Sequence, residues 1–427
     1  MKKTILQHII ILFAIPLLGL ILLIAAFLLP VDSMREHVYW SMDAISEEFD
    51  DEMLINGFKA SLTGNFTDCL MLEQAIYENK DHSLLNSVLH IYRGESSFSK
   101  DEWMPGVSLA DYLGGAEQLE VEYSRYWHGY LVILKPLLMI FSLSSLRLFN
   151  SALQLLCVGI CVILMTEKKR KGLAPAFLFS LPFLYFVSTF ASLSLSICLY
   201  ITLFSVIFLL LKEDYLKEKK ALCLYFLILG MFTSYFDFLT YPIVTLGFPL
   251  CVCLYSDKSK AKESLLHTLV YSAEWGFGYI WMWASKWIIA DVLSDCTTIK
   301  DALHTISERT QSAEGYSRGS GFLQVLKSNL GEYANRGFAV LTCLIAIMVL
   351  CVLIKRIKNV KEGISSLIPF LPVAVYPFAW WFLTQNHSSE HSMFTCRIFS
   401  VCIFALLTAI ASMTEDKKTE TFSKKAD

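Results

Sequence analysis

Residues that could carry chemistry gather in a few polar stretches between long apolar segments. Asp68 follows Asn65 and Thr67, residue types that cap a helix start, so it falls in the first turn of a predicted helix. The positive end of that helix favours an ionised carboxylate. Asp68 is therefore either a further cap or a general base that accepts a proton from a hydroxyl group. Asp50 and Asp51, in the densest carboxylate run of the same region, compete for the second role.

Asp237 is a second candidate, because it is the only charged residue in a short turn between two apolar segments. Ionisable groups at membrane depth are functional candidates. Asp is also common in turns, where its side chain bonds the backbone that follows it. The sequence therefore leaves Asp237 either as a site residue that orients a substrate or as a turn former.

The most polar turn between two apolar segments covers residues 385–397. His387 and His391 are four residues apart and share one face if the turn is helical. Together with Arg397 they make a candidate anion site for a phosphate group. The same spacing suits a divalent metal, although two ligands do not complete a metal site. A plain polar turn is the third interpretation.

His128 and Lys135 stand at another boundary between polar and apolar sequence, and they are the remaining candidate phosphate contacts. Lys135 could equally extend its ammonium group from an apolar helix to the membrane surface. Both residues belong to the stretch that decides how often the chain crosses a membrane.

The apolar segments indicate the fold class, because a chain with 55% hydrophobic residues is not an ordinary soluble protein. A membrane span needs about 20 residues. The run 131–141 has 11 residues and contains Pro136, so we predict an interfacial or dipping helix at 129–144. The run from 146 to 165 is long enough for a true span and is followed by a basic cluster at 168–171.

The basic clusters then indicate the sidedness, since Lys and Arg accumulate in cytoplasmic loops. With one span between 126 and 165, every basic cluster falls on one side of the membrane. The sequence predicts an all-α, polytopic membrane protein of about ten transmembrane helices with both termini in the cytoplasm. Its expected parts are an anchor (1–29), a helical extracytoplasmic loop (30–128), the interfacial helix (129–144), a bundle (145–413) with an outer loop (291–333), and a cytoplasmic tail (414–427). Within the outer loop, we expect residues 321–330 to form a short amphipathic helix.

The extracytoplasmic loop is acidic, with 19 Asp and Glu residues against 6 Lys and Arg residues. Such a surface repels nucleic acid, which is therefore not an expected partner. Ten of the 12 cysteines lie in or beside apolar segments, where Cys acts as a small hydrophobic residue, while Cys69 and Cys296 could pair outside them. No Walker motif is present, so we expect no ATP site. No cofactor is indicated with certainty, and a divalent metal stays an open alternative.

The order of these segments resembles integral-membrane glycosyltransferases of the GT-C class, such as protein O-mannosyltransferases and aminoarabinose transferases. The resemblance rests on an anchor span, a large outer loop with a carboxylate, and a short helix with Lys135-Pro136 before a span that begins with Ser145-Leu146-Arg147. This chain has one proline where that family usually has two. It is also similar to uncharacterised bacterial membrane proteins that carry the stretches 65–68 and 386–397, which favours Asp68 as the carboxylate.

The resemblance implies a glycosyltransferase of the bacterial cytoplasmic membrane. It would move a sugar from a polyprenyl-phosphate donor to an extracytoplasmic acceptor. Asp68 would be the base and Asp237 would orient a substrate, while the phosphate would be bound by His387, His391 and Arg397, supported by His128 and Lys135. Two other classes stay open: a transporter or lipid-linked glycan flippase that uses Glu274 and Lys286, and a non-catalytic envelope assembly protein.

Overall fold

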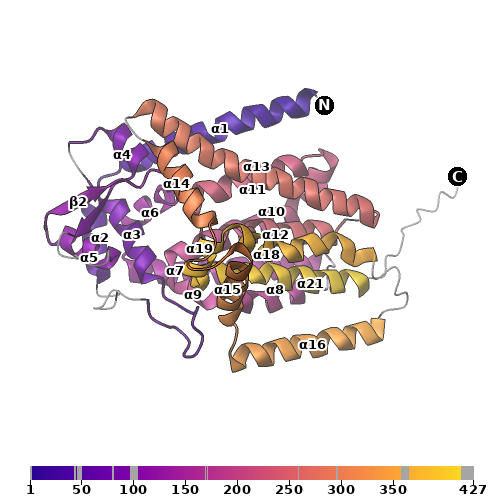
Figure 1. Cartoon of the computed structure of the whole chain (residues 1–427). Coiled ribbons are helices and arrows are strands. Elements are labelled where there is room, and N and C mark those ends of the chain that lie inside the picture. Colours follow the sequence, from indigo (N-terminus) through magenta and orange to yellow (C-terminus); the bar gives the residue numbers. More distant parts are fainter. Residues whose placement is uncertain are drawn as a thin grey trace.

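The computed structural model describes residues 2–42, 45, 51–78, 81–96, 104–168, 170, 172–257, 259–294, 297–356 and 365–414. Asp50, Cys296 and the tail beyond Thr414, on which the sequence made predictions, lie outside the described residues. The molecule is a helical bundle with a smaller domain at one end (Figure 1). The start of α1 and the end of α16 lie at the end opposite that domain.

The bundle identifies a multi-pass membrane protein. Among the residues that the structure describes, five helices are long and apolar enough to cross a membrane: Ile5–Phe27, Leu143–Glu167, Leu193–Glu218, Ser365–Leu383 and Ser392–Met413. A sixth span results if the pair Arg318–Gly331 and Arg336–Cys351, bent by 89°, is counted as one broken span. These segments belong to α1 (Lys2–Phe27), α7 (Leu143–Glu167), α10 (Leu193–Glu218), α15 (Arg318–Gly331), α16 (Arg336–Arg356), α18 (Leu371–Leu383) and α21 (Phe399–Thr414).

The predicted count of about ten spans is not confirmed. Three expected spans contain only short apolar helices, which are Leu173–Leu184, α11 (Leu222–Phe236) and α12 (Ile243–Tyr255). At 1.5 Å per residue they are about 18 to 23 Å long, less than a hydrocarbon core of ~30 Å. Another expected span, α13 (Ala261–Leu293), is long but carries several charged residues and does not qualify by hydropathy.

The domain formed by the loop after α1 is mostly helical, as predicted, but it also contains a small sheet that the sequence analysis missed. Strands β1 (Arg93–Ser96) and β2 (Gln118–Val121) pair antiparallel. The all-α prediction is therefore correct only as the dominant class. The helices of this domain are α2 (Asp32–Ser41), α3 (Asn65–Ile76), α4 (Leu84–His90) and α5 (Pro105–Leu113).

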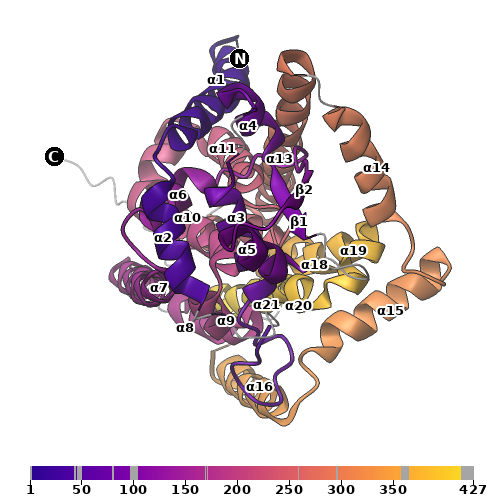
Figure 2. The ribbon, with the colours of Figure 1, turned by 90° about the vertical axis from the view of Figure 1, so that its left-hand side faces the viewer.

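A short helix precedes α7, where the sequence predicted one. α6 (Leu131–Leu138) contains Pro136, and its eight residues are too few to cross a membrane. The outer loop forms α14 (Thr298–Thr310) and α15, so the helix expected at 321–330 is present. Figure 2 shows α14, α15 and α16 following one another around one side of the molecule. Between α18 and α21 lie α19 (Gln385–Glu390) and α20 (Ser392–Thr395).

Two glycines bring α11 and α13 into close contact. A Cβ atom on Gly278 would overlap the carbonyl of Leu227, and one on Gly230 would overlap the carbonyl of Trp275. Small residues permit such approaches between helices in membranes, where dispersion contacts and hydrogen bonds drive association. This crossing holds the C-terminal end of α11, and with it Asp237, against the C-terminal half of α13.

Candidate functional site

Asp68 lies fully buried where the domain of α2 to α5 meets the bundle; we call this part the outer domain, after its predicted location. Its carboxylate accepts hydrogen bonds from the backbone N–H groups of Leu193 (3.0 Å) and Ser194 (3.2 Å), at the start of α10. The Arg147 guanidinium lies 3.4 Å away. Burial raises the pKa of Asp68 to about 6, although Arg147 and the two backbone donors oppose that shift. Asp68 therefore caps a long helix, and its predicted role as a base stays a prediction.

The start of α3 differs from the sequence prediction. Its N-cap is Gly64, in the left-handed region at φ 72°, and this cap provides no side-chain hydrogen bond. Instead, Asp51 Oδ1 accepts the N–H of Phe66 at 3.3 Å. Asn65, which we expected to act as a cap, accepts a hydrogen bond from Arg147 at 2.8 Å. Asp51 thus has a structural contact of the same kind as Asp68, at the positive end of a helix.

Three buried cations bind backbone carbonyls between the outer domain and other parts of the chain. Lys135 donates to the Ala75 carbonyl at 2.6 Å, in the last turn of α3. Arg397 donates to the Ala60 carbonyl at 2.8 Å. Lys286 donates to the Leu89 carbonyl at 2.7 Å, near the end of α4. Cations at helix C-termini are favourable because they complement the partial negative charge there. A phosphate bound by Lys135 or Arg397, as predicted, would therefore compete with these backbone carbonyls for the same donors.

Both ring nitrogens of His128 also have partners inside the protein. Its Nε2 lies 2.9 Å from the Tyr123 carbonyl and its Nδ1 lies 2.9 Å from the Tyr130 hydroxyl. Burial lowers the pKa of His128 to about 3, so the ring is neutral at physiological pH. A neutral ring with both nitrogens engaged is a poor phosphate ligand.

The remaining predicted residues come together with one that sequence reasoning missed. We call the group Asp237, Arg309, His387 and His391 the outer polar centre. Arg309, in the last turn of α14, donates to His387 Nδ1 at 2.5 Å, and His387 Nε2 lies 3.0 Å from the Leu239 carbonyl. The rings of His387 and His391 are 4.8 Å apart, so the predicted shared face is confirmed. The Leu239 N–H donates to Asp237 at 2.9 Å, which connects the turn to the centre.

Arg309 is the cation of this centre. Burial and the nearby Arg309 charge lower the pKa of His387 well below its usual value and lower that of His391 to about 4, so both rings are neutral. On the same helix, Asp301 pairs with Arg125 at 2.9 Å, whereas no ion pair joins Arg309 to a carboxylate among the described residues. Arg309 is half-buried and therefore accessible from solution. The geometry suits an anion that approaches Arg309 and His391.

Aromatic residues lie near the outer polar centre. Tyr126 is buried, and the charges of Arg309 and Asp237 both act on its hydroxyl. The Tyr126 ring lies 5.9 Å from that of Trp283. The Tyr279 hydroxyl and the Trp283 indole N–H are buried and have no hydrogen-bond partner among the described residues. Such unpaired donors are costly in an apolar setting and suggest a polar ligand.

Backbone strain occurs in the same place. Leu239 has φ 76°, in the left-handed region that a branched side chain rarely adopts. It is held there from both sides, since Asp237 accepts its N–H and His387 bonds its carbonyl. Burial raises the pKa of Asp237 to about 6, and the Thr240 hydroxyl and N–H oppose the shift. Strain of this kind persists where the surroundings enforce it, often at functional sites.

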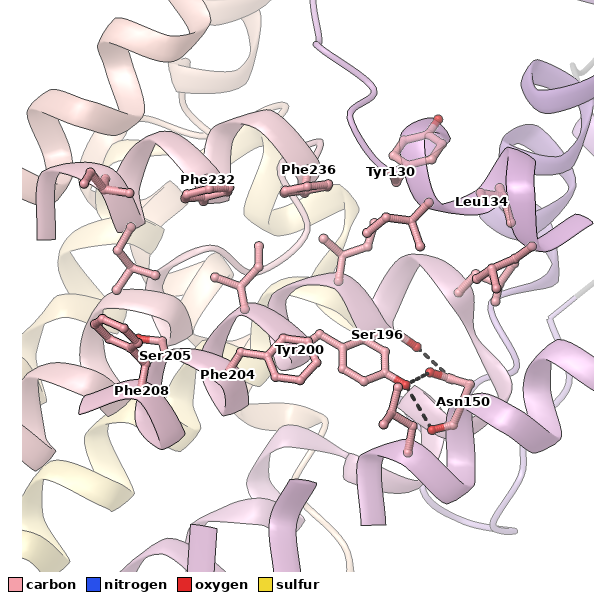
Figure 3. Close-up of a pocket in the computed structure, with 18 of the residues that line it drawn as sticks. Tyr130, Leu134, Asn150, Ser196, Tyr200, Phe204, Ser205, Phe208, Phe232 and Phe236 are labelled. Carbon is pink, nitrogen blue, oxygen red and sulfur yellow. Dashed lines mark hydrogen bonds between the residues drawn. The ribbon is translucent and has the colours of Figure 1, made fainter. Parts of the chain in front are cut away.

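A lateral groove lies between α10 and α11, on another side of α11. Its volume is about 710 Å³, and its lining is almost entirely apolar. Figure 3 shows Phe232 and Phe236 on one side and Tyr200, Phe204 and Phe208 on the other, with Tyr130 and Leu134 at one end. Asn150 and Ser196 supply a small polar patch in its wall, where Tyr200 donates to Asn150 Oδ1 at 2.7 Å.

The two residues expected for transport, Glu274 and Lys286, have separate contacts in the structure. Glu274 lies 3.5 Å from His8 of α1. Lys286 is fully buried and bonds α4, as described above. Among the described residues, no group of three or more His, Cys, Asp or Glu side chains could hold a metal ion. Cys69 is a buried free thiol, while its proposed partner Cys296 lies outside the described residues.

No protein-family model, curated protein or solved structure matches this chain. The candidate site therefore depends on the geometry of this chain alone. Of its members, Asp237, His387 and His391 were predicted from the sequence. Arg309 was missed because it lies in the mixed-charge loop 291–333, where its separation of 78 residues from His387 hides the contact.

Proposed function

We propose that this protein is a membrane glycosyltransferase that uses a polyprenyl-phosphate sugar at the extracytoplasmic face. The observation that carries the proposal is the half-buried Arg309 beside His391, without a carboxylate partner among the described residues. A guanidinium group binds phosphate oxygens with several directed donors. The unpaired Tyr279 hydroxyl and Trp283 N–H add neutral donors in the same neighbourhood.

In the proposed reaction, the oxygen of an acceptor hydroxyl forms a bond to the anomeric carbon of the sugar. The bond from that carbon to the phosphate oxygen breaks, and polyprenyl phosphate leaves with the bonding electron pair. Arg309 stabilises the charge of the departing phosphate. The hydroxyl proton passes to a carboxylate, for which we choose Asp237 over Asp68. Asp237 and His387 both bond the backbone of Leu239, and Arg309 bonds His387. With a pKa of about 6, Asp237 is mostly ionised at neutral pH and can accept a proton.

The orientation that this function requires is part of the proposal. The domain of α2 to α5 faces the extracytoplasmic side of a bacterial cytoplasmic membrane, and both termini are cytoplasmic. The short apolar helices Leu173–Leu184, α11 and α12, together with α13, complete about ten crossings. Basic residues near the ends of α7 and α10 support it, since Arg170 and Lys217 both contact Glu213 and thus gather at one end of the bundle. Clustered Lys and Arg residues mark cytoplasmic ends.

The test is a transfer assay with purified protein in lipid nanodiscs. The donor is a polyprenyl phosphate with a radiolabelled hexose, the acceptor is a cell-envelope extract, and the measurement is labelled product together with released polyprenyl phosphate. Arg309→Gln should abolish transfer, because a neutral amide cannot stabilise the departing phosphate. Asp237→Asn should lower the rate while donor binding is retained.

Lys300→Gln is the matched control, because Lys300 is exposed on the same helix as Arg309. It removes the same formal charge and should leave transfer unchanged. Equal transfer by wild type and Arg309→Gln would remove the phosphate role of the outer polar centre. Movement of a fluorescent lipid between leaflets without sugar transfer would favour the flippase. Absence of both activities would favour the assembly protein.

A further inference from the structure

The lateral groove is about as long as the hydrocarbon core of a bilayer is thick. Its lining residues on α10 run from Leu193 to Leu216, which is about 35 Å at 1.5 Å per residue. The hydrocarbon core of a bilayer is ~30 Å thick, so each leaflet supplies roughly half of that height. A lipid tail confined to one leaflet would therefore fill only part of the groove.

Aromatic side chains line both walls of the groove. Parallel aromatic pairs stand along both sides: Tyr200 with Phe204 on α10 at 5.6 Å, and Phe232 with Phe236 on α11 at 6.1 Å. Farther along, the rings of Phe208 and Tyr225 stack at 5.8 Å, and Tyr225 hydrogen-bonds to Ser205. This contact joins α10 to α11 in the inner part of the groove.

The other end of the groove reaches the outer domain. Met71 of α3, together with Tyr130 and Leu134 at α6, lines that end. The Tyr130 ring lies 5.5 Å from Phe238, and Phe238 lies 6.4 Å from Tyr126 beside the outer polar centre. The groove thus begins close to the site to which we assign the phosphate, and it continues into the opposite half of the bundle.

We propose that the groove binds one polyisoprenoid chain long enough to pass from the outer leaflet into the inner one. This inference rests on the proposed function, since it identifies the lipid part of the same donor. Full occupancy requires a chain longer than one leaflet, which ordinary phospholipid tails do not provide. The groove therefore selects donors by chain length, and the outer polar centre selects them by phosphate.

The experiment uses lipid probes with a photoreactive group at the far end of the chain, added to the full-length protein in nanodiscs. Four probes are compared: a long and a short polyprenyl phosphate, a long polyprenol without phosphate, and a phospholipid. After irradiation, peptide mapping locates the labelled residues. The long probes should label the inner end near Leu216 and Ala221, whereas the short probe should label the middle near Ile201 and Ile228.

Two variants and one control test the depth of binding. Ala221→Trp fills the inner end, so it should remove labelling by the long probes and leave labelling by the short probe unchanged. Ile201→Trp fills the middle and should remove both. Ile347→Trp, at an exposed position of α16, should change neither. The thermal unfolding midpoint of each variant shows whether it folds.

The outcomes separate this inference from the proposed function. Inner-end labelling by the phospholipid at the same level as the long polyprenyl phosphate would overturn the inference, because the groove would then hold annular lipid. Unchanged long-probe labelling in Ala221→Trp would also overturn it. If the polyprenol labels the inner end but Arg309→Gln does not weaken binding of the phosphate probe, the groove inference stands and the phosphate site fails.

Discussion

At the scale of single residues, burial turns several candidate catalytic groups into structural ones. Asp68, Lys135 and Arg397 each bind backbone groups in the interior, at helix ends or in loops. A buried charge is tolerated only when hydrogen bonds or an opposite charge compensate for lost hydration. These compensating contacts also fix each side chain in place. A side chain that took part in a reaction would therefore have to give up its hydrogen bonds to the backbone. Arg309 differs because it is half-exposed and bonds a neutral histidine.

Asp68 gives a pH-dependent prediction. Its pKa rises from 3.8 to about 6 in the folded protein, so between these values the unfolded chain ionises while the folded chain keeps the proton. Wild type should therefore lose stability relative to Asp68→Asn as the pH rises from about 4 to about 6, by about 3 kcal/mol, and the difference should then stay constant. The measurement is thermal unfolding in detergent at a series of pH values.

The control for this prediction is Asp68→Leu, which cannot accept the N–H groups of Leu193 and Ser194. Asp68→Asn retains one acceptor and should keep the start of α10 folded, while Asp68→Leu should be destabilised at every pH. A stability difference between wild type and Asp68→Asn that does not vary with pH would contradict the raised pKa. Loss of sugar transfer in a well-folded Asp68→Asn variant would indicate that Asp68, rather than Asp237, is the base.

At the scale of elements, the crossing of α11 and α13 decides where the candidate site can form. α11 has its groove-lining residues on one side, and its C-cap is Asp237. α13 carries Tyr279 and Trp283 in its C-terminal half, and Tyr279 lies close enough to Asp237 for the two groups to interact electrostatically. A small shift between these helices would therefore move these aromatic residues relative to Asp237.

Gly278→Ala should disturb that crossing. The added Cβ atom would overlap the Leu227 carbonyl, so the helices must separate, at a cost of about 1–3 kcal/mol. We expect a lower thermal midpoint and weaker donor binding, measured on protein purified in nanodiscs. Gly276→Ala is the matched control on the same helix, because nothing lies within 4 Å of its added Cβ atom. It should be neutral or slightly stabilising, since Ala favours helices over Gly. Equal effects of the two changes would show that general helix propensity explains the result.

At the scale of the whole molecule, charged side chains from the bundle hold the outer domain. Lys286 of α13 reaches α4, Arg397 reaches Ala60, and Asp68 of the domain reaches the start of α10. These contacts join residues 125 to 337 positions apart in the chain. The domain is thus positioned by directed hydrogen bonds in addition to apolar packing.

Lys286→Met should loosen the outer domain while leaving the bundle intact. The Leu89 carbonyl loses its donor, and an unsatisfied buried carbonyl costs about 1–3 kcal/mol. Hydrogen exchange should increase in α4, and the exchange rates of α10 and α12 should stay unchanged. Lys300→Met, at an exposed position, removes the same charge as a control. Unchanged exchange in α4 would argue that apolar contacts alone hold the domain.

The sequence by itself determined the coarse architecture, because hydropathy and the limit on span length act locally along the chain. Those local rules predicted the anchor, the short helix around Pro136 and the helical outer loops. They also predicted that His387 and His391 share a face, since four residues make about one helical turn. They did not predict β1 and β2, and they gave a span count that helices such as α12 are too short to confirm.

Only the tertiary structure decided which polar residues have partners inside the protein. The side chains of Asp68 and Arg397 bond groups that are more than 100 residues away in the chain. A local sequence pattern does not predict such contacts. The same is true of Arg309, which gains its place beside His387 through the fold of α14. The lateral groove is lined by residues of α6, α7, α10 and α11, so it is a property of helix packing rather than of any one helix. Long-range contacts thus separate the capping residues from the candidate site.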